Sequence, residues 1–274
     1  MLVQSINEED IMEFWILVII ALLVSAIGFY KYVYFISLGY GFSIAAMGVG
    51  LIIMYKDSLT LWTVLACILF VIYGCRLGGY LLIREIKSKS YGAHMKKEIK
   101  SGKGMNFGVK VAIWVTCVLL YVLEVAPVYI RMANGGKVDT VCIVGIVIMI
   151  IGLIIESLAD VQKSRTKAVN PNDFCSKGLY RMVRCPNYFG EVIFWTGVFI
   201  SGITTYASAI QWTMAVLGYV GIVYVMFSGA RRLEIRQNKN YGDREDYQKY
   251  VKSTPILIPL IPLYSVEKHK WLVA

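Results

Sequence analysis

The sequence predicts an all-α membrane protein, a bundle of seven transmembrane helices. The first observation is composition: of 274 residues, 57% are hydrophobic and 17% are charged, which is too apolar for an ordinary soluble domain. The second is length, because several apolar runs reach the roughly 20 residues that a helix needs to cross a bilayer. The third is that the Lys and Arg residues gather in a few segments outside these runs.

Seven apolar runs are predicted as spans. The first follows an acidic stretch, residues 1–10, without the basic start and small-residue cleavage site of a signal peptide, so we expect it to be retained. The sixth is short and lies close to the seventh, which predicts a helical hairpin. The seven are Ile11–Tyr30, Val33–Met54, Leu59–Ile83, Val111–Ile130, Val141–Leu158, Tyr188–Ile203 and Ala207–Phe227.

The charge distribution predicts the orientation. With seven spans, the segments 76–110, 163–184 and 231–270 fall on one side of the membrane, and they hold 24 of the 28 Lys and Arg residues. Because short cytoplasmic loops retain Lys and Arg, that side is the cytoplasm, with the N-terminus outside and the C-terminus inside. The net charge of +10 is therefore an orientation signal, and we expect no nucleic-acid binding. We expect a multi-pass protein of a bacterial inner membrane or its endoplasmic reticulum equivalent.

Cysteine and histidine usage argues against a metal centre. The six Cys show no CxxC spacing, and four of them lie within predicted spans, where Cys behaves as a small apolar residue. His94 and His269 are far apart and have no Cys or carboxylate at ligand spacing. We therefore expect no metal, and an enzyme of this kind must use an organic cofactor or none.

The stretch Gly178–Glu191, GLYRMVRCPNYFGE, has the residue types of a nucleotide pocket. Arg181 and Arg184 carry planar donors that suit phosphate oxygens, and Asn187 offers an amide with donors and acceptors. The rings of two tyrosines, Tyr180 and Tyr188, can stack on a base. The alternative is that the arginines are anchors among lipid headgroups.

A helix is expected to begin within this stretch. Pro186 cannot continue a preceding helix but fits the first turn of a new one. The free N–H groups of that turn would favour an anion.

Two further segments place polar residues on one helical face. Tyr73, Arg76, Tyr80 and Arg84 recur at steps of three and four, although Gly74 and Gly78 in the same stretch also match a helix-packing pattern. A second face holds Glu156, Asp160, Lys163 and Lys167. These residues either form an intrahelical salt-bridge ladder or contact a ribose and phosphates.

Together these motifs resemble those of a known family. The stretches ESLADVQK (156–163), GLYRMVRCPNYFGE (178–191), RRLEIRQ (231–237) and DYQKYVKSTPILIPLIP (246–262) are similar to the integral-membrane steroid 5-alpha-reductase-like family, in its DUF1295 branch. The resemblance covers about Tyr73 to Pro262. It implies a single membrane domain over 1–274, with three helices and a basic loop in 1–106 and a cofactor-binding half in 107–274.

The resemblance also implies an activity. NADPH, bound in the cytosolic half, would reduce an activated C=C bond of a steroid-like or lipid-like enone that enters from the bilayer. The protein would be a monomer whose partners are this lipophilic substrate and membrane lipids. Tyr73 would donate a hydrogen bond to the substrate carbonyl, and a phenol can stabilise the developing enolate without ionising. The cofactor contacts would be Arg76, Tyr80, Arg84, Asp160, Lys163, Lys167, Tyr180, Arg184, Asn187, Tyr188, Glu191, Arg232 and Glu234.

The chain departs from the family pattern at two places. Cys185 stands where the usual motif Arg-His-Pro-Asn-Tyr has histidine, and the second span has no carboxylate, so Tyr40 is the candidate to replace that acid. Two other functions therefore stay open. One is an S-adenosylmethionine-dependent methyltransferase of the isoprenylcysteine or phospholipid type, against which the missing histidine and the Asp-x-Gln-Lys run at 160–163 count. The other is a non-catalytic sterol-binding membrane protein.

The tail after Phe227 has two expected parts. Residues 241–250 alternate Tyr with charged residues and form an amphipathic segment. The proline-containing segment Ile256–Leu263 is expected to lie along the membrane interface. A tail folded under the bundle would keep water away from hydride transfer.

Overall fold

The computed structural model describes residues 8–87 and 105–273, and this part of the chain is helical and contains no strand. The predicted all-α membrane class is therefore confirmed. Six helices are long and apolar enough to cross a membrane. They are Met12–Phe29, Tyr32–Met54, Leu61–Ile83, Phe107–Ala133, Thr140–Val169 and Ala209–Tyr241. The helix at the position of the sixth predicted span, α7 (Pro186–Gly202), has 17 residues.

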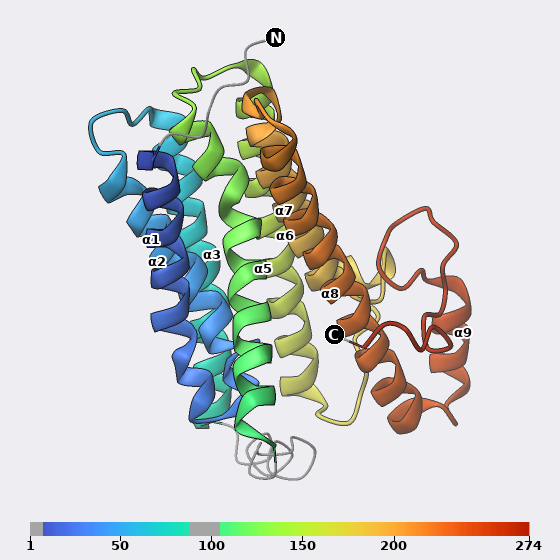
Figure 1. Cartoon of the computed structure of the whole chain (residues 1–274). Helices are drawn as coiled ribbons and strands as arrows, with labels where there is room; N and C mark the ends of the chain where they lie inside the picture. The colour runs from blue at the N-terminus through green and yellow to red at the C-terminus, as the bar shows by residue number, and fades with distance from the viewer. Residues whose placement is uncertain (1–7, 88–104, 274) are drawn as a thin grey trace. The chain divides into compact units, whose positions relative to one another are not determined.

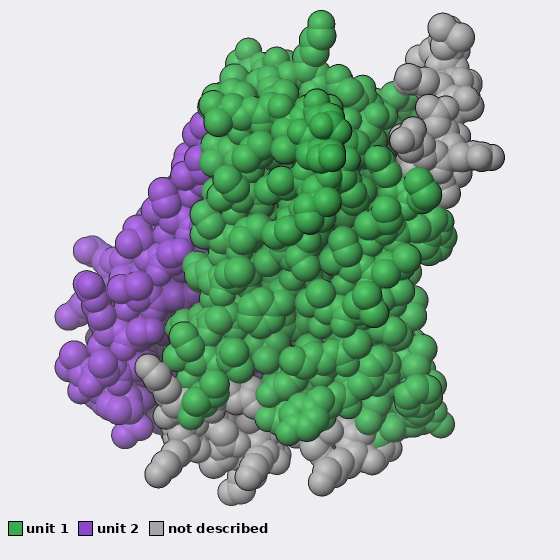
Figure 2. Space-filling view, turned by 90° about the vertical axis from the view of Figure 1, so that its left-hand side faces the viewer, with its two compact units in different colours: residues 1–146, 198–218 green, residues 147–197, 219–274 purple. Residues whose placement is uncertain are grey.

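The chain divides into two compact units, which Figure 2 colours separately. Unit 1 consists of Met1–Ile146 and Val198–Gly218, and unit 2 of Val147–Gly197 and Tyr219–Ala274. Each unit is described below by itself.

Unit 1 is a set of neighbouring helices, α1 (Glu8–Ser25), α2 (Leu38–Met54), α3 (Leu61–Lys87) and α5 (Phe107–Ala133) (Figure 1). Helix α2 packs most extensively on α3. A β-carbon added at Gly41 would lie 2.8 Å from the Gly74 carbonyl oxygen and 2.9 Å from the Gly78 nitrogen. The glycine pair in α3 therefore has the helix-packing role that its spacing allowed, because only glycine lets two backbones approach so closely.

A buried clasp closes one end of unit 1. Arg131, near the end of α5, is 2% exposed and donates to the Ser201 carbonyl (2.6 Å) and the Lys137 carbonyl (2.7 Å). Its Nη2 also donates to Asp139 (3.2 Å) and to Thr204 (2.5 Å). All three guanidinium nitrogens are thus hydrogen-bonded, and the clasp joins the end of α5 to the turn η4 (Ile203–Thr205).

Unit 2 contains the later part of α6 (Thr140–Val169), most of α7, the later part of α8 (Ala209–Tyr241) and α9 (Glu245–Ser253). Both α6 and α8 run well past the predicted span ends at Leu158 and Phe227. The apolar runs end there, but the polar residues that follow, such as Gln162 and Lys163, are good helix formers, so the helices continue. A β-carbon at Gly190 would lie 2.6 Å from the Glu156 nitrogen, so glycine also permits the close contact of α6 with α7.

Candidate functional site

The Gly178–Glu191 stretch starts with a tight turn, η3 (Gly178–Arg181), and ends in the first turns of α7. Gly178 has a φ of 64°, a left-handed conformation that glycine adopts without strain. The following amide, of Leu179, donates to the side-chain oxygen of Gln162 on α6 at 2.9 Å. Helix α7 begins at Pro186, which confirms the predicted helix start.

Arg184 is buried in unit 2 and is held by an ion pair. Its side chain is 0% exposed, and its Nη2 donates to Oε1 of Glu234 on α8 at 2.7 Å. The same nitrogen donates to the Tyr264 carbonyl. The other Glu234 oxygen, Oε2, accepts the backbone N–H of Val266 at 2.8 Å. Two segments distant in sequence, α8 and the tail, therefore meet at this arginine.

Arg184 also has donors to spare. Within residues 8–87 and 105–273, its Nε and Nη1 are buried and have no hydrogen-bond partner, and the same is true of the side-chain oxygen of Asn187. An unsatisfied buried polar group costs about 1–3 kcal/mol, and more if it is charged. Such groups are satisfied by ordered water or by a ligand, and here they offer donors for an anionic oxygen beside an amide acceptor.

The tail covers this arginine from outside the membrane helices. The backbone amides of Arg184 and Cys185 donate to the Pro255 carbonyl (2.8 Å) and the Ile256 carbonyl (3.0 Å). Tyr250 of α9 donates to the Tyr180 carbonyl at 2.7 Å. The tail after Lys252 is thus part of the wall around the motif.

An aromatic cluster supports the tail. The ring of Phe174 lies 5.1 Å from that of Tyr247, 5.4 Å from that of Tyr250 and 5.8 Å from that of Tyr241. The Arg244 guanidinium lies 4.8 Å from the Phe174 ring centre. These contacts fix α9 against the loop between α6 and α7, so the covering of the motif is rigidly packed.

Burial sets the chemistry of two groups beside Arg184. It raises the pKa of the Cys185 thiol to about 12, although the positive charges of Arg184 and Lys163 act in the opposite direction. It also raises the pKa of Tyr247 to about 12, again opposed by Arg184. Burial therefore favours the protonated, neutral form of both groups.

Unit 1 contains the two predicted catalytic tyrosines. Tyr73 on α3 donates to the hydroxyl of Tyr40 on α2 at 2.9 Å, and both residues are buried. The Tyr40 ring also lies 5.0 Å from that of Tyr121 on α5. The sequence predicted different roles for them, Tyr73 as the donor to a substrate carbonyl and Tyr40 as the replacement for the missing acid, and the structure joins them by a hydrogen bond.

Comparison with known proteins decides the family. A family model described as "Protein of unknown function (DUF1295)" matches residues 14–254. The chain belongs to the DUF1295 family. This family is steroid 5-alpha-reductase-like, so the resemblance predicted from the motifs is confirmed. The searches of curated proteins and of solved structures found no match to the chain.

In this DUF1295 protein, the predicted site residues fall into two sets. Unit 2 holds Asp160, Lys163, Lys167, Tyr180, Arg184, Asn187, Tyr188, Glu191, Arg232 and Glu234, and unit 1 holds Tyr40, Tyr73, Arg76, Tyr80 and Arg84. The side chain of Arg84 lies outside the described residues.

Not every predicted cofactor contact has spare hydrogen-bonding capacity. The Lys167 ammonium already donates to the Asp173 carbonyl (2.6 Å), the Tyr241 hydroxyl (2.8 Å) and the Pro171 carbonyl (2.9 Å). Because an ammonium has three donors, this geometry favours a structural role, in which Lys167 ties α6 to the end of α8. Its contact with a phosphate stays a prediction.

Sequence reasoning missed several residues of the candidate site. The Tyr264 carbonyl accepts from Arg184, the Val266 amide donates to Glu234, and Tyr247 packs on Phe174, yet none of these residues was predicted to be part of the site. The tyrosine-rich composition of 241–250 was the available signal for Tyr247. No sequence signal marks a backbone carbonyl or amide as a partner of a distant side chain. Among the described residues, no group of three His, Cys, Asp or Glu could hold a metal ion.

Proposed function

We propose that this DUF1295 protein uses NADPH to reduce an activated C=C bond in a lipid-like enone within the membrane. The observation that carries the proposal is Arg184, a buried arginine with one nitrogen bonded to Glu234 and two nitrogens without partners among the described residues. A guanidinium that donates to a carboxylate through one nitrogen is held in place, and its remaining N–H groups can then donate to a phosphate oxygen. Membership of a steroid 5-alpha-reductase-like family supports the same reaction.

Arg184 and Asn187 would bind the cofactor most directly. The spare N–H groups of Arg184 suit the diphosphate, and the Asn187 side-chain oxygen can accept from a carboxamide or ribose hydroxyl. Tyr188, whose ring edge lies within 3.2 Å of a β-carbon built at Gly229, offers a stacking face beside α8. Asp160, Lys163, Glu191 and Arg232 would complete the contacts. NADPH, when bound, supplies the hydride.

The tyrosine pair would act on the substrate carbonyl. A hydroxyl that accepts one hydrogen bond donates a stronger one, so Tyr73 strengthens Tyr40 as a donor. Hydride addition at the β-carbon moves negative charge onto the enone oxygen, and a donor aimed at that oxygen stabilises the charge as it develops. The pair thus replaces the carboxylate that the second span lacks.

The membrane topology is part of the proposal. Helix α7 would be the seventh span, although its 17 residues extend only about 26 Å, slightly less than the ~30 Å hydrocarbon core. With seven spans, the basic segments, α9 and the tail lie in the cytoplasm, where NADPH is available, and the N-terminus lies outside.

A ligand titration tests the cofactor. The protein is purified in detergent, and its unfolding temperature is followed with increasing NADPH or S-adenosylmethionine, because a ligand that binds only the folded state raises stability by mass action. We expect stabilisation by NADPH and its loss in Asn187→Leu, which removes the amide at similar volume. Stabilisation by S-adenosylmethionine alone would overturn the reductase proposal in favour of a methyltransferase, and stabilisation by neither would favour a non-catalytic sterol-binding protein.

The reaction is tested with a cyclic enone steroid. NADPH consumption is followed by absorbance in the parent protein and in Tyr40→Phe and Tyr73→Phe. We expect Tyr40→Phe, which removes the donor to the enone oxygen, to lower the rate about 10²–10³-fold. Tyr73→Phe removes only the hydrogen bond to Tyr40 and should lower the rate less, and NADPH binding should be unchanged in both.

A further inference from the structure

The tail after α9 exposes apolar side chains that the cofactor site does not explain. Leu260 is 100% exposed, and Ile261, Trp271 and Val273 are exposed too. Leu260 also has a φ of 66°, a left-handed conformation that is unfavourable for a residue with a β-carbon. The backbone of Leu260 is strained and its side chain is fully exposed. Such strain persists where another interaction compensates for it, which indicates that this leucine has a binding partner.

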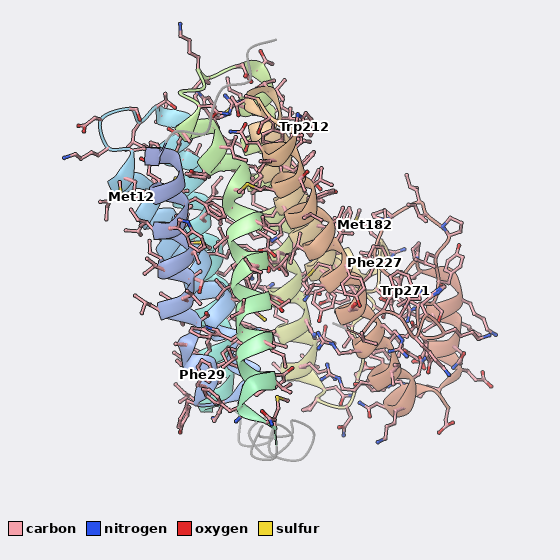
Figure 3. All side chains as sticks on the ribbon, viewed as in Figure 1. Met12, Phe29, Met182, Trp212, Phe227 and Trp271 are labelled. Carbon is pink, nitrogen blue, oxygen red and sulfur yellow. The ribbon has the colours of Figure 1, made fainter. Side chains whose placement is uncertain are left out.

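Trp271 attaches the tail to a defined level of α8. Its ring stacks on that of Tyr224, with centres 6.0 Å apart and planes at 23°, and its carbonyl accepts the Tyr224 hydroxyl at 2.8 Å. Two turns further along α8, Arg231 donates to the Glu267 carbonyl at 2.9 Å. In the sequence of α8, Tyr224 precedes and Arg231 follows Phe227, the predicted end of the last span. The tail is therefore attached to α8 near that predicted end; Phe227 and Trp271 are labelled in Figure 3.

The surface of α8 that Trp271 continues is exposed and apolar at Val220. Val220, one helical turn before Tyr224, is 56% exposed on a helix that is apolar enough to cross a membrane. Tryptophan and tyrosine concentrate where such a helix leaves the hydrocarbon. Lys268 and Lys270, both exposed, precede this tryptophan and match the anionic headgroups found at that depth.

The loop after α9, which precedes Lys268 and Trp271 in the chain, also runs beside α8. In Figure 1 the connection after α9 reaches back along α8, away from the end of α8 where α9 begins. It contains Leu260 and Ile261. The chain from 255 to 263 is held in place by the Ile256 amide, which donates to the Leu263 carbonyl at 2.8 Å.

We propose that residues 258–273 form a second contact with the membrane. Lipids of the cytoplasmic leaflet cover Leu260, Ile261 and Trp271, and Lys268 and Lys270 bind anionic headgroups. Burial of the leucine in lipid offsets the strain of its backbone. The inference rests on the membrane topology proposed above and not on the reaction, so a failure of NADPH binding would leave it standing.

Spin labels in nanodiscs test the contact. In the full chain with Cys75, Cys117 and Cys175 replaced by serine, a label is attached at Leu260→Cys, and a control label at Glu245→Cys in the first turn of α9. The collisions of the label with two paramagnetic reagents are measured: oxygen, which concentrates in lipid, and a nickel chelate, which stays in water. We expect the oxygen-to-nickel accessibility ratio to be several-fold higher at 260 than at 245.

Equal ratios at the two positions, or a label at 260 that is more accessible to nickel, would overturn the proposal. If Leu260→Cys fails to fold, Ile261→Cys replaces it. The headgroup contact is tested by adding phosphatidylglycerol to phosphatidylcholine nanodiscs. The ratio at 260 should rise in the parent and stay constant in Lys268→Gln/Lys270→Gln. If phosphatidylglycerol does not change the ratio in the labelled protein with both lysines intact, the proposal that Lys268 and Lys270 bind anionic headgroups is wrong.

Discussion

Arg131 in unit 1 and Arg184 in unit 2 are both almost fully buried, at 2% and 1% exposed, yet their hydrogen bonding differs. All three nitrogens of Arg131 donate to protein oxygens, two of them backbone carbonyls. Arg184 bonds through Nη2 alone, and its other two nitrogens have no partner among the described residues.

The difference suits a structural role for Arg131 and the ligand-binding role proposed above for Arg184. A guanidinium has five N–H donors, and burial makes each unsatisfied donor costly. In unit 1 the fold itself satisfies the arginine, so no ligand is needed. In unit 2, Nε and Nη1 of Arg184 have no partner among the described residues, and the proposal is that a phosphate satisfies them.

The largest expected effect is on stability. Arg184→Met leaves the Glu234 carboxylate, which is 1% exposed, buried and without its cation, and breaking such a pair costs about 3–5 kcal/mol. Arg131→Met leaves Asp139, whose side chain is 38% exposed and can be rehydrated, so a loss of about 1–3 kcal/mol is expected. Denaturant unfolding in one detergent measures both.

A matched control isolates the ion pair. The double variant Arg184→Met/Glu234→Leu removes both charges and should regain most of the stability lost in Arg184→Met. If Arg131→Met were the more damaging of the two single variants, the distinction between the arginines would be wrong.

The second effect concerns the cofactor. Arg184→Lys keeps a positive charge but loses the planar fork, so the NADPH dissociation constant should rise about tenfold or more, equivalent to about 1.4 kcal/mol. Fluorescence titration of NADPH in detergent measures it. Arg131→Lys serves as the control and should leave the affinity unchanged, and a matching loss in that control would show that general destabilisation is being measured.

A smaller effect appears at alkaline pH in unit 2. Burial raises the pKa of Tyr247 from 10.0 to about 12, although Arg184 opposes the shift. Because the folded state holds the proton more tightly, this contribution to stability is complete below pH 10 and is lost as the pH rises through about 12. Tyr247→Phe should flatten the fall in unfolding temperature over this range. An unchanged slope would contradict the assignment.

The smallest effect is at acid pH in unit 1. Burial acts to raise the pKa of Asp139, but hydrogen bonds from Thr204 and the Cys142 amide, together with the Arg131 charge, bring it below 3.8. The contribution of Asp139 to stability is therefore complete above about pH 3.8 and is lost as the pH falls through its folded value. Asp139→Asn should weaken this acid dependence, as measured by thermal unfolding between pH 5 and 3, whereas Arg184→Lys should not.

Several elements were predictable because their causes are local. The helix start at Pro186 follows from the missing N–H of proline, and the contact of α2 with α3 follows from the small residues at 74 and 78. The membrane class follows from composition. Span ends were predicted less well, since hydropathy marks where the apolar run stops and not where the helix stops: α8 continues to Tyr241.

By itself, the sequence determined the helical membrane class and the family, and it supplied the residue types on which the prediction of a nucleotide pocket rests, because each depends on composition or on residues close together in the chain. Only the tertiary structure decided how the arginines are used. Arg184 meets Glu234 and Tyr264 at separations of 50 and 80 residues, and Arg131 meets Ser201 and Thr204 at 70 and 73. Whether a buried arginine has N–H donors left for a ligand depends on those distant partners, and the residues next to it in the sequence do not reveal them.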